Sequence, residues 1–264
     1  MVNLLGTLWN AAGELLLKTL NLFYGLTHSY GLAIILLTIL VRVILHPLNQ
    51  KQLVSMQKMQ KIQPRIKALQ EKHGNDKQKL NEETMKLYKE NKVNPAAGCL
   101  PLLVQLPILI LLFRVLTNFK FGGVSFFGVG LEESVLSTMG KALGLSAQTP
   151  GITALLSGIA ANPAGLMNVG IYGPNLLLLV SIGFLTWFQQ QLSASNNPQM
   201  AFMNWFMPVF LTFICLNLPG GVLLYWGVSS LMSVFQQWRV VKTTEIEMEK
   251  KPTLFKNKPT RDGE

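Results

Sequence analysis

Charged residues and cysteines are both scarce in this sequence. Asp, Glu, Lys and Arg make up 14% of its 264 residues, whereas they make up roughly 25% of an ordinary globular domain. The mean hydropathy of +0.33 also argues against a soluble fold. The two cysteines, Cys99 and Cys215, both lie inside apolar stretches, so a framework of disulfide bonds is not expected.

Patterns that carry enzyme chemistry are missing as well. His28, His46 and His73 are scattered without the spacing of a metal site or a catalytic triad, and no GxSxG, HExxH or P-loop sequence occurs. We therefore expect no enzymatic activity, no metal and no cofactor. The first residues lack the basic segment and the cleavage site of a secretion signal, and we interpret them as retained.

Five apolar stretches are present instead, each close to the roughly 20 residues that a helix needs to cross the hydrocarbon core of a bilayer. They cover residues 31–48, 100–117, 176–192, 201–218 and 222–238. The sequence therefore predicts an all-α integral membrane protein with five transmembrane helices. The alternative, a soluble protein with buried core helices, would have to contain five such stretches in one short chain.

The basic residues behind the net charge of +10 indicate the orientation, since Lys and Arg collect in cytoplasmic loops. Eleven of them against five acids lie in residues 51–92, and seven against five lie in residues 239–264. The segment between the second and third stretches holds only two lysines and two glutamates. We predict that residues 51–92 and the C-terminus are cytoplasmic, and that this weakly charged segment and the N-terminus are outside.

Residues 1–30 are predicted to form an amphipathic helix that lies in the outer interface of the membrane. Leucines recur along it at helical spacing, while asparagines and Glu14 mark another face. The alternative is a sixth transmembrane helix, but Glu14 and Lys18 would then lie near its middle. The recurring leucines are Leu4, Leu8, Leu15, Leu22 and Leu26.

Residues 51–96 are interpreted as an antiparallel helical hairpin that projects into the cytoplasm. An apolar stripe steps by three or four residues along the first half, His73-Gly74-Asn75-Asp76 breaks it, and Pro64 is expected to bend the first helix. The stripe consists of Met56, Met59, Ile62, Ile66 and Leu69. The residues of the second helix that are expected to pack against it are Leu80, Leu87 and Tyr88.

Two interpretations of this hairpin stay open. It is either a solvated spacer or a docking arm. In the second case the adaptable methionines Met56 and Met59 and the lysines Lys58 and Lys61 meet anionic lipid or ribosomal RNA. The sequence does not separate lipid from RNA.

Arg42 lies inside the first apolar stretch, where an arginine costs on the order of 3 kcal/mol on insertion scales. No Asp or Glu occurs in any of the five stretches, so an ion pair within the bundle is not available. We predict that Arg42 faces a wet cavity open to the cytoplasm; snorkelling toward the headgroups is the alternative. Arg114, near the outer end of the second stretch, is expected to snorkel outward.

Polar side chains in the other stretches are candidates to line this cavity. Each glutamine among them could equally make an interhelical hydrogen bond. The candidates are Gln105, Gln189, Gln190, Gln191, Ser229, Ser230 and Ser233.

Three segments resemble the YidC family of membrane protein insertases. They read GLAIILLTILVRVILHPLNQKQLVSMQKMQKIQPRIKALQEK, KLYKENKVNPAAGCLPLLVQLPILILLFRVL and LPGGVLLYWGVSSLMSVFQQW, in the family's order. The combination of an Arg before His-Pro-Leu, a Met/Lys/Gln-rich hairpin, NPxxGCLP and PGGxxLYW is specific. The third and fourth stretches fit more loosely.

The resemblance implies a five-helix core in the bacterial inner membrane around a hydrophilic groove that is open to the cytoplasm and lipid and closed to the outside. It implies that Arg42 lies on the groove floor and that Tyr225 and Trp226 contact the substrate. Cys99 matches a family cysteine, for which we assign no chemical role. With the polar candidates, the predicted groove residues are Arg42, Gln105, Gln189, Tyr225, Trp226, Ser229 and Ser233.

The function that the resemblance implies is insertion and assisted folding of newly made membrane proteins. Ribosomes would deliver them, with or without the Sec translocon, and a monomer would suffice. Two alternatives stay open: a small-molecule transporter or channel, which should show an inverted repeat and midplane acids, and an assembly chaperone without insertase activity. We expect the chain to lack the periplasmic domain and first span of Gram-negative members and the lipoprotein signal of many Gram-positive ones.

The predicted organisation follows from these observations. The 119–174 segment is longer than is usual in the family and is expected to form short extracytoplasmic helices. The divisions are 1–30 for the outer helix, 31–50 for the first span, 51–96 for the hairpin, 97–118 for the second span, 119–174 for the outer segment, 175–242 for the last three spans, and 243–264 for a disordered basic cytoplasmic tail.

Overall fold

The computed structural model describes residues 2–74, 76–91, 93–94, 100–119, 121–146, 150–193 and 198–250. Cys99 and the part of the predicted tail from residue 251 onward lie outside these residues. Helices dominate the described chain, which confirms the predicted all-α fold. They are α1 (Val2–Thr27), α2 (Tyr30–His73), α3 (Lys77–Glu90), α4 (Leu100–Asn118), α5 (Val135–Ala142), α6 (Ile152–Ala161), the 3-10 helix η2 (Pro163–Met167), α7 (Val169–Ser193), α8 (Pro198–Cys215) and α9 (Gly220–Lys250).

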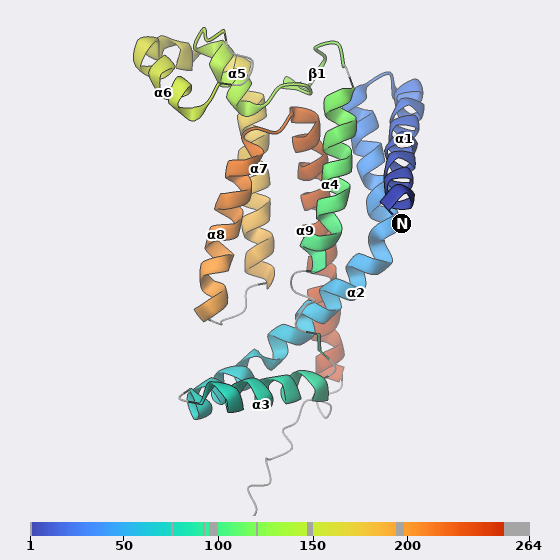
Figure 1. Ribbon diagram of the computed structural model, residues 1–264, viewed down its shortest axis with the longest axis vertical. Helices are drawn as coiled ribbons and strands as arrows, with labels where there is room; N and C mark the ends of the chain where they lie inside the picture. The colour runs from blue at the N-terminus through green and yellow to red at the C-terminus, as the bar shows by residue number, and fades with distance from the viewer. Residues whose placement is uncertain are drawn as a thin grey trace, which may run out of the picture.

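A bundle of long helices forms the body of the molecule, and α9 lies at its centre between α2 and α7 (Figure 1). Among the described residues, α2 and α7 are long and apolar enough to cross a membrane, judged by length and composition. Helices α4 and α8 contain the shorter apolar stretches Gln105–Thr117 and Trp205–Cys215. The count of five spans stays a prediction.

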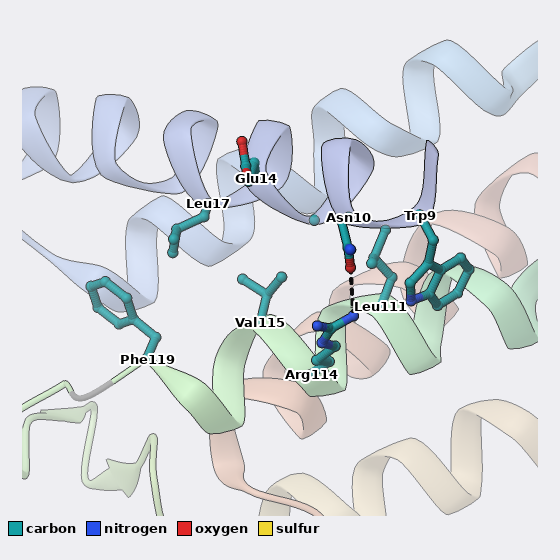
Figure 2. Close-up of a pocket in the computed structure, with 9 residues that line it drawn as sticks. Trp9, Asn10, Glu14, Leu17, Leu111, Arg114, Val115 and Phe119 are labelled. Carbon is teal, nitrogen blue, oxygen red and sulfur yellow. Dashed lines mark hydrogen bonds between the residues drawn. The ribbon is translucent and has the colours of Figure 1, made fainter. Parts of the chain in front are cut away.

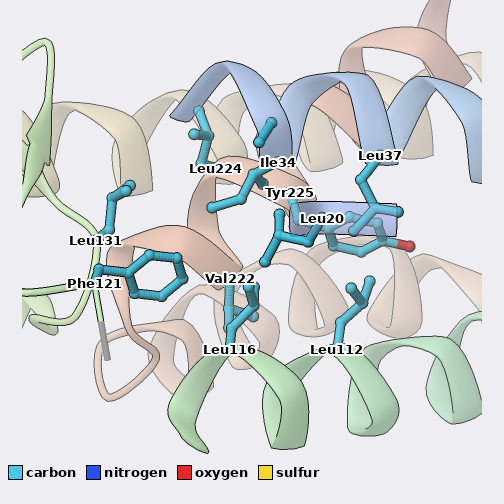
Figure 3. Packing of buried hydrophobic residues seen from close by; sticks show 11 residues of the cluster. Leu20, Ile34, Leu37, Leu112, Leu116, Phe121, Leu131, Val222, Leu224 and Tyr225 are labelled. Carbon is cyan, nitrogen blue, oxygen red and sulfur yellow. The ribbon is translucent and has the colours of Figure 1, made fainter. Parts of the chain in front are cut away.

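Helix α9 packs on both of its sides. On one side it meets α2 and α4 in a cluster of buried residues that includes Ile34, Leu112 and Val222 (Figure 3). On the other side Leu223 packs with Leu179 of α7 and with Cys215. The absence of a side chain at Gly227 allows α7 to approach closely, because a Cβ there would lie 3.3 Å from Leu178, and such small residues favour helix contacts within membranes.

Helix α1 is part of the bundle. It packs against α2 and α4 (Figure 1), and Leu20 is completely buried in the cluster that also contains Ile34. His28 adopts a positive φ of 51° between α1 and α2, where a left-handed residue commonly ends a helix. The predicted position of α1 in the outer interface stays a prediction.

Helix α2 continues without interruption from the bundle into the cytoplasmic hairpin, so the predicted first span and hairpin share one helix. Pro47 and Pro64 both lie inside it. Its last turns pack against α3 through a hairpin cluster of four buried residues, Ile62, Ile66, Leu87 and Val93. Asp76 caps α3, since the Lys79 amide donates to its carboxylate at 3.0 Å.

The outer cap, residues 121–174, covers the end of the bundle opposite the hairpin (Figure 1). It contains α5, α6, η2 and a two-stranded antiparallel sheet of β1 (Ser125–Phe126) and β2 (Val129–Gly130). The cap is joined to the start of α9, because the amides of Gly220 and Gly221 donate to the carbonyls of Glu133 and Leu131 at 2.9 and 2.8 Å. A Cβ at Gly220 would lie 2.2 Å from the Gly130 carbonyl oxygen, so this join requires glycine.

The end of α9 differs from the sequence prediction. The predicted disordered tail begins at residue 243, but α9 continues to Lys250. Residues 243–250 read TTEIEMEK, and Glu, Met and Lys are good helix formers, so the helix extends past the apolar span.

Candidate functional site

Arg42 projects from α2 toward α9 and makes a hydrogen bond inside the bundle. Its Nε donates to the Ser229 hydroxyl at 2.6 Å. Ser229 is 1% exposed and Arg42 is half-buried, so the contact lies within the protein. Among the described residues no carboxylate forms an ion pair with Arg42; the recorded pair joins Lys141 and Glu133 in the outer cap.

A second interhelical hydrogen bond lies one turn earlier on α9, toward its N-terminus. The Gln105 side-chain amide of α4 donates to the Tyr225 hydroxyl at 3.1 Å. Residues four apart lie on one helix face, so Tyr225 and Ser229 present neighbouring acceptors to α4 and α2. Polar partners from two separate helices therefore meet the same side of α9.

These residues belong to a polar stripe along α9, which we define as Tyr225, Ser229, Ser233 and Gln237, one residue in every four. The Ser233 hydroxyl donates to the Ser229 carbonyl at 3.0 Å. The Gln237 amide donates to the Gln189 carbonyl of α7 at 3.5 Å. All four stripe residues are buried. The stripe thus connects α9 to α2, α4 and α7.

Further polar contacts lie toward the cytoplasmic end. The Gln236 side-chain nitrogen and His46 Nδ1 are 3.0 Å apart, which joins α9 to α2 one turn beyond Arg42. The Gln60 amide of the hairpin donates to the Leu192 carbonyl at the end of α7 at 3.3 Å. Sequence reasoning did not assign these residues to the site. It also missed Gln237, which the four-residue spacing from Ser233 could have indicated.

The two aromatic residues of the predicted groove differ in their surroundings. Tyr225 is 1% exposed and its ring belongs to the buried cluster between α9, α2 and α4 (Figure 3). Ile34 and Leu112 enclose the ring in this cluster, and substrate contact by Tyr225 stays a prediction. Trp226 is half-buried and packs against the cluster around Leu223. The cytoplasm-open groove itself stays a prediction.

The four predicted docking residues of the hairpin lie in different environments. Met59 packs against the hairpin cluster, so it supports the hairpin's own fold. Met56 is half-buried, as is Lys61, whereas Lys58 is exposed. Lys58 is the residue of this set that is most available to a partner.

Long apolar helices around an arginine that hydrogen-bonds across the bundle are typical of a helical integral membrane protein with polar side chains in its interior. The chain belongs to the 60Kd inner membrane protein family, whose model matches residues 22–249. This membership, together with the apolar helices, supports placement in the bacterial inner membrane.

Curated relatives and a solved structure agree with this membership. The chain is 36% identical over 228 residues to the membrane protein insertase YidC of Oleidesulfovibrio alaskensis, covering 86% of this chain and 38% of the relative. It is 36% identical over 230 residues to that of Francisella tularensis subsp. novicida, covering 87% of this chain and 35% of the relative. The chain therefore spans less than two fifths of the length of these relatives.

The solved structure is described as an active YidC insertase crystal structure with the first transmembrane domain resolved. It superposes with a TM-score of 0.59 at 27% identity and covers 89% of this chain and 46% of that one. The likeness therefore extends over most of this chain rather than over one helix pair.

Proposed function

We infer that this protein inserts newly made membrane proteins into the bilayer and assists their folding, without catalysing a chemical reaction. The observation that carries this proposal is the Arg42–Ser229 hydrogen bond inside the bundle. It keeps a cation in the membrane region with no ion-pair partner among the described residues. Family membership supports it, because the relatives named above are called membrane protein insertases.

The proposed mechanism begins with an incoming polar segment, often acidic, that must cross lipid. An isolated charge in hydrocarbon is expensive, so a groove open to the cytoplasm shortens the dry path. Arg42 attracts the acidic segment, and water with the neighbouring polar side chains solvates it. Ser229 holds the guanidinium toward the bundle interior through its hydroxyl.

The apolar helix of the substrate then moves along exposed apolar surface into lipid. The sequence favours α7 and α9 for this role. Exposure supports α7, where Leu177, Val180 and Phe184 are exposed, whereas α9 is buried over Val222–Tyr225 and exposes Leu231 and Phe235 only toward its inner end. Burial at roughly 25 cal/mol per Å² of apolar area supplies the driving force.

Delivery involves the cytoplasmic side. We assign ribosome contact to the basic tail and either ribosome or anionic lipid contact to the hairpin, with Lys58 as the exposed residue. The protein works alone or beside the Sec translocon, and one copy of the chain suffices. In this proposal the C-terminus is cytoplasmic, and the junction of α1 with α2 lies at the outer end of the bundle (Figure 1).

The test uses the purified chain in sealed vesicles and a single-span test protein with an acidic N-terminal tail. Protease protection of the tail measures insertion. Arg42→Ala should lower insertion about tenfold, the factor that 1.4 kcal/mol represents, while Arg42→Lys retains most of it because diffuse attraction needs charge and not a planar fork. Arg239→Ala, an exposed arginine of α9, is the matched control.

Two results would contradict the proposal. Equal insertion by the wild type and Arg42→Ala across acidic test proteins would remove the electrostatic step. Vesicles that move small solutes but protect no test protein would favour the alternative of a transporter or channel.

A further inference from the structure

A cavity of about 330 Å³ lies between α1 and α4, away from the polar stripe of α9. Along it the two helices run in the same direction (Figure 2). Its size is near the lower end of the roughly 300–1,000 Å³ of ligand pockets, which suits a compact polar group rather than a whole lipid. The lining residues are Trp9, Asn10, Gly13, Glu14, Leu17, Leu111, Arg114, Val115 and Phe119.

Two opposite charges line this cavity without neutralising each other. Arg114 donates to the Asn10 side-chain oxygen at 3.1 Å, and Glu14 lies one helical turn after Asn10 on α1. Among the described residues no ion pair joins Arg114 to Glu14. Asn10, Glu14 and Arg114 are all exposed, so the cavity opens at the protein surface and both charges are accessible.

The rest of the lining is apolar and leaves room. Leu17, Val115 and Phe119 form one end of the cavity, while Trp9, Asn10 and Arg114 gather at the other (Figure 2). Gly13 contributes no side chain; a Cβ there would lie 3.4 Å from Leu111 and 3.9 Å from Val115. The missing side chain lets Leu111 of α4 approach α1 closely beside the cavity.

The order of the charges matches that of a lipid headgroup in the outer leaflet. Because α1 and α4 run in parallel, Glu14 lies closer than Asn10 and Arg114 to the outer end of α4. On the predicted orientation, the cation is therefore deeper in the membrane than the carboxylate. In a zwitterionic phospholipid the phosphate is likewise closer to the acyl chains, and the amine is further out.

We propose that this cavity binds the headgroup of an outer-leaflet phospholipid that carries both a phosphate and a primary ammonium group, as phosphatidylethanolamine does. Arg114, held by Asn10, donates charge-assisted hydrogen bonds to the phosphate. The Glu14 carboxylate accepts from the ammonium, and the acyl chains extend along the bundle below. In a lipid without the ammonium group, the negative charge of the phosphate would face the Glu14 carboxylate without compensation. A trimethylated amine has no N–H group to donate to Glu14.

The test measures lipid retained by the purified full chain in detergent, by native mass spectrometry. Phosphatidylethanolamine, phosphatidylcholine and phosphatidylglycerol with identical acyl chains are compared. The wild type should retain phosphatidylethanolamine about tenfold better than the other two, the factor of one or two charge-assisted hydrogen bonds. Glu14→Gln should abolish this preference, and Arg114→Gln should lower retention of all three lipids.

Matched variants separate the site from general lipid contact. Lys18→Gln removes an exposed charge of α1 that does not line the cavity and should change nothing. Gly13→Leu fills the cavity without changing a charge and should lower retention of phosphatidylethanolamine. If Arg114→Gln lowers the thermal unfolding temperature, Glu14→Gln decides, because the Glu14 side chain makes no hydrogen bond or ion pair within the described part of the chain.

The proposal is overturned if the wild type retains the three lipids equally, or if Glu14→Gln keeps the preference. It is also overturned if inorganic phosphate displaces bound lipid as effectively as added phosphatidylethanolamine does, because the cavity would then be a site for a free anion. None of these readouts depends on insertion activity.

Discussion

The Tyr225 hydroxyl is the one polar atom of a ring that is otherwise enclosed by apolar side chains of the bundle. It accepts from Gln105 at 3.1 Å. Tyr225→Phe should leave the packing unchanged and strand the Gln105 amide, which costs about 1 kcal/mol. Thermal unfolding in detergent measures this loss, and Gln105→Leu combined with Tyr225→Phe should recover part of it. A large loss of insertion at unchanged stability would instead indicate that Tyr225 touches the substrate.

At the same scale, sequence reasoning placed both Arg42 and Ser229 in the groove but did not identify the hydrogen bond between them. An arginine in an apolar stretch is conspicuous because it costs so much there. Ser229 lies 187 residues further along the chain, and only the packing of α2 against α9 brings the two together. The burial of Tyr225 was hidden for the same reason: residue type alone does not report which face of α9 meets α2 and α4.

At the scale of elements, the hairpin was predictable because its signal is local. The three-to-four spacing of Ile62 and Ile66 places them on one face, and the structure packs them against Leu87. The continuity of α2 was not predictable, since Pro47 and Pro64 normally disfavour a helix interior. The turn between β1 and β2 was not predicted either, because Phe127 takes a φ of 48°, a conformation that Asn or Gly usually adopts.

The two interpretations of the hairpin predict different results for one surface change. Lys58→Glu reverses an exposed charge and should leave the fold intact. If the hairpin is a docking arm, binding to anionic vesicles or ribosomes falls several-fold, at roughly 1 kcal/mol per basic residue near a charged surface. If it is a spacer, binding is unchanged. Flotation and co-sedimentation measure the two partners separately.

A control variant removes the hairpin's packing instead. Ile66→Ala truncates a side chain that is 4% exposed, and such changes cost about 2–5 kcal/mol in a well-packed core. Hydrogen exchange of α3 should accelerate while the bundle stays protected. Faster exchange throughout the bundle would show that the hairpin and bundle unfold together.

The outer cap depends on Asn175, which lies near the start of α7 and is completely buried. Its side chain accepts from the Gly130 amide at 2.9 Å and donates to the Glu133 carbonyl at 3.0 Å. Asn175→Ala should cost about 1–3 kcal/mol, because buried backbone groups lose their partners. Asn175→Asp should be worse than Ala, since a carboxylate would face the Glu133 carbonyl. Thermal unfolding of both variants gives the order, and an Asp variant as stable as the wild type would contradict it.

At the scale of the whole molecule, charge is distributed unevenly along the chain, and the net charge of +10 is concentrated where the cytoplasmic side is predicted. Residues 251–264 contain four basic residues and two acids. Removing them should weaken co-sedimentation with ribosomes at low salt, and the wild type should lose the same binding as salt rises, because RNA contacts release counterions. The shortened chain should still insert a test protein from free solution, since Arg42 and the polar stripe are intact. Unchanged ribosome binding by the shortened chain would transfer that role to the hairpin, where Lys58→Glu then becomes the decisive change.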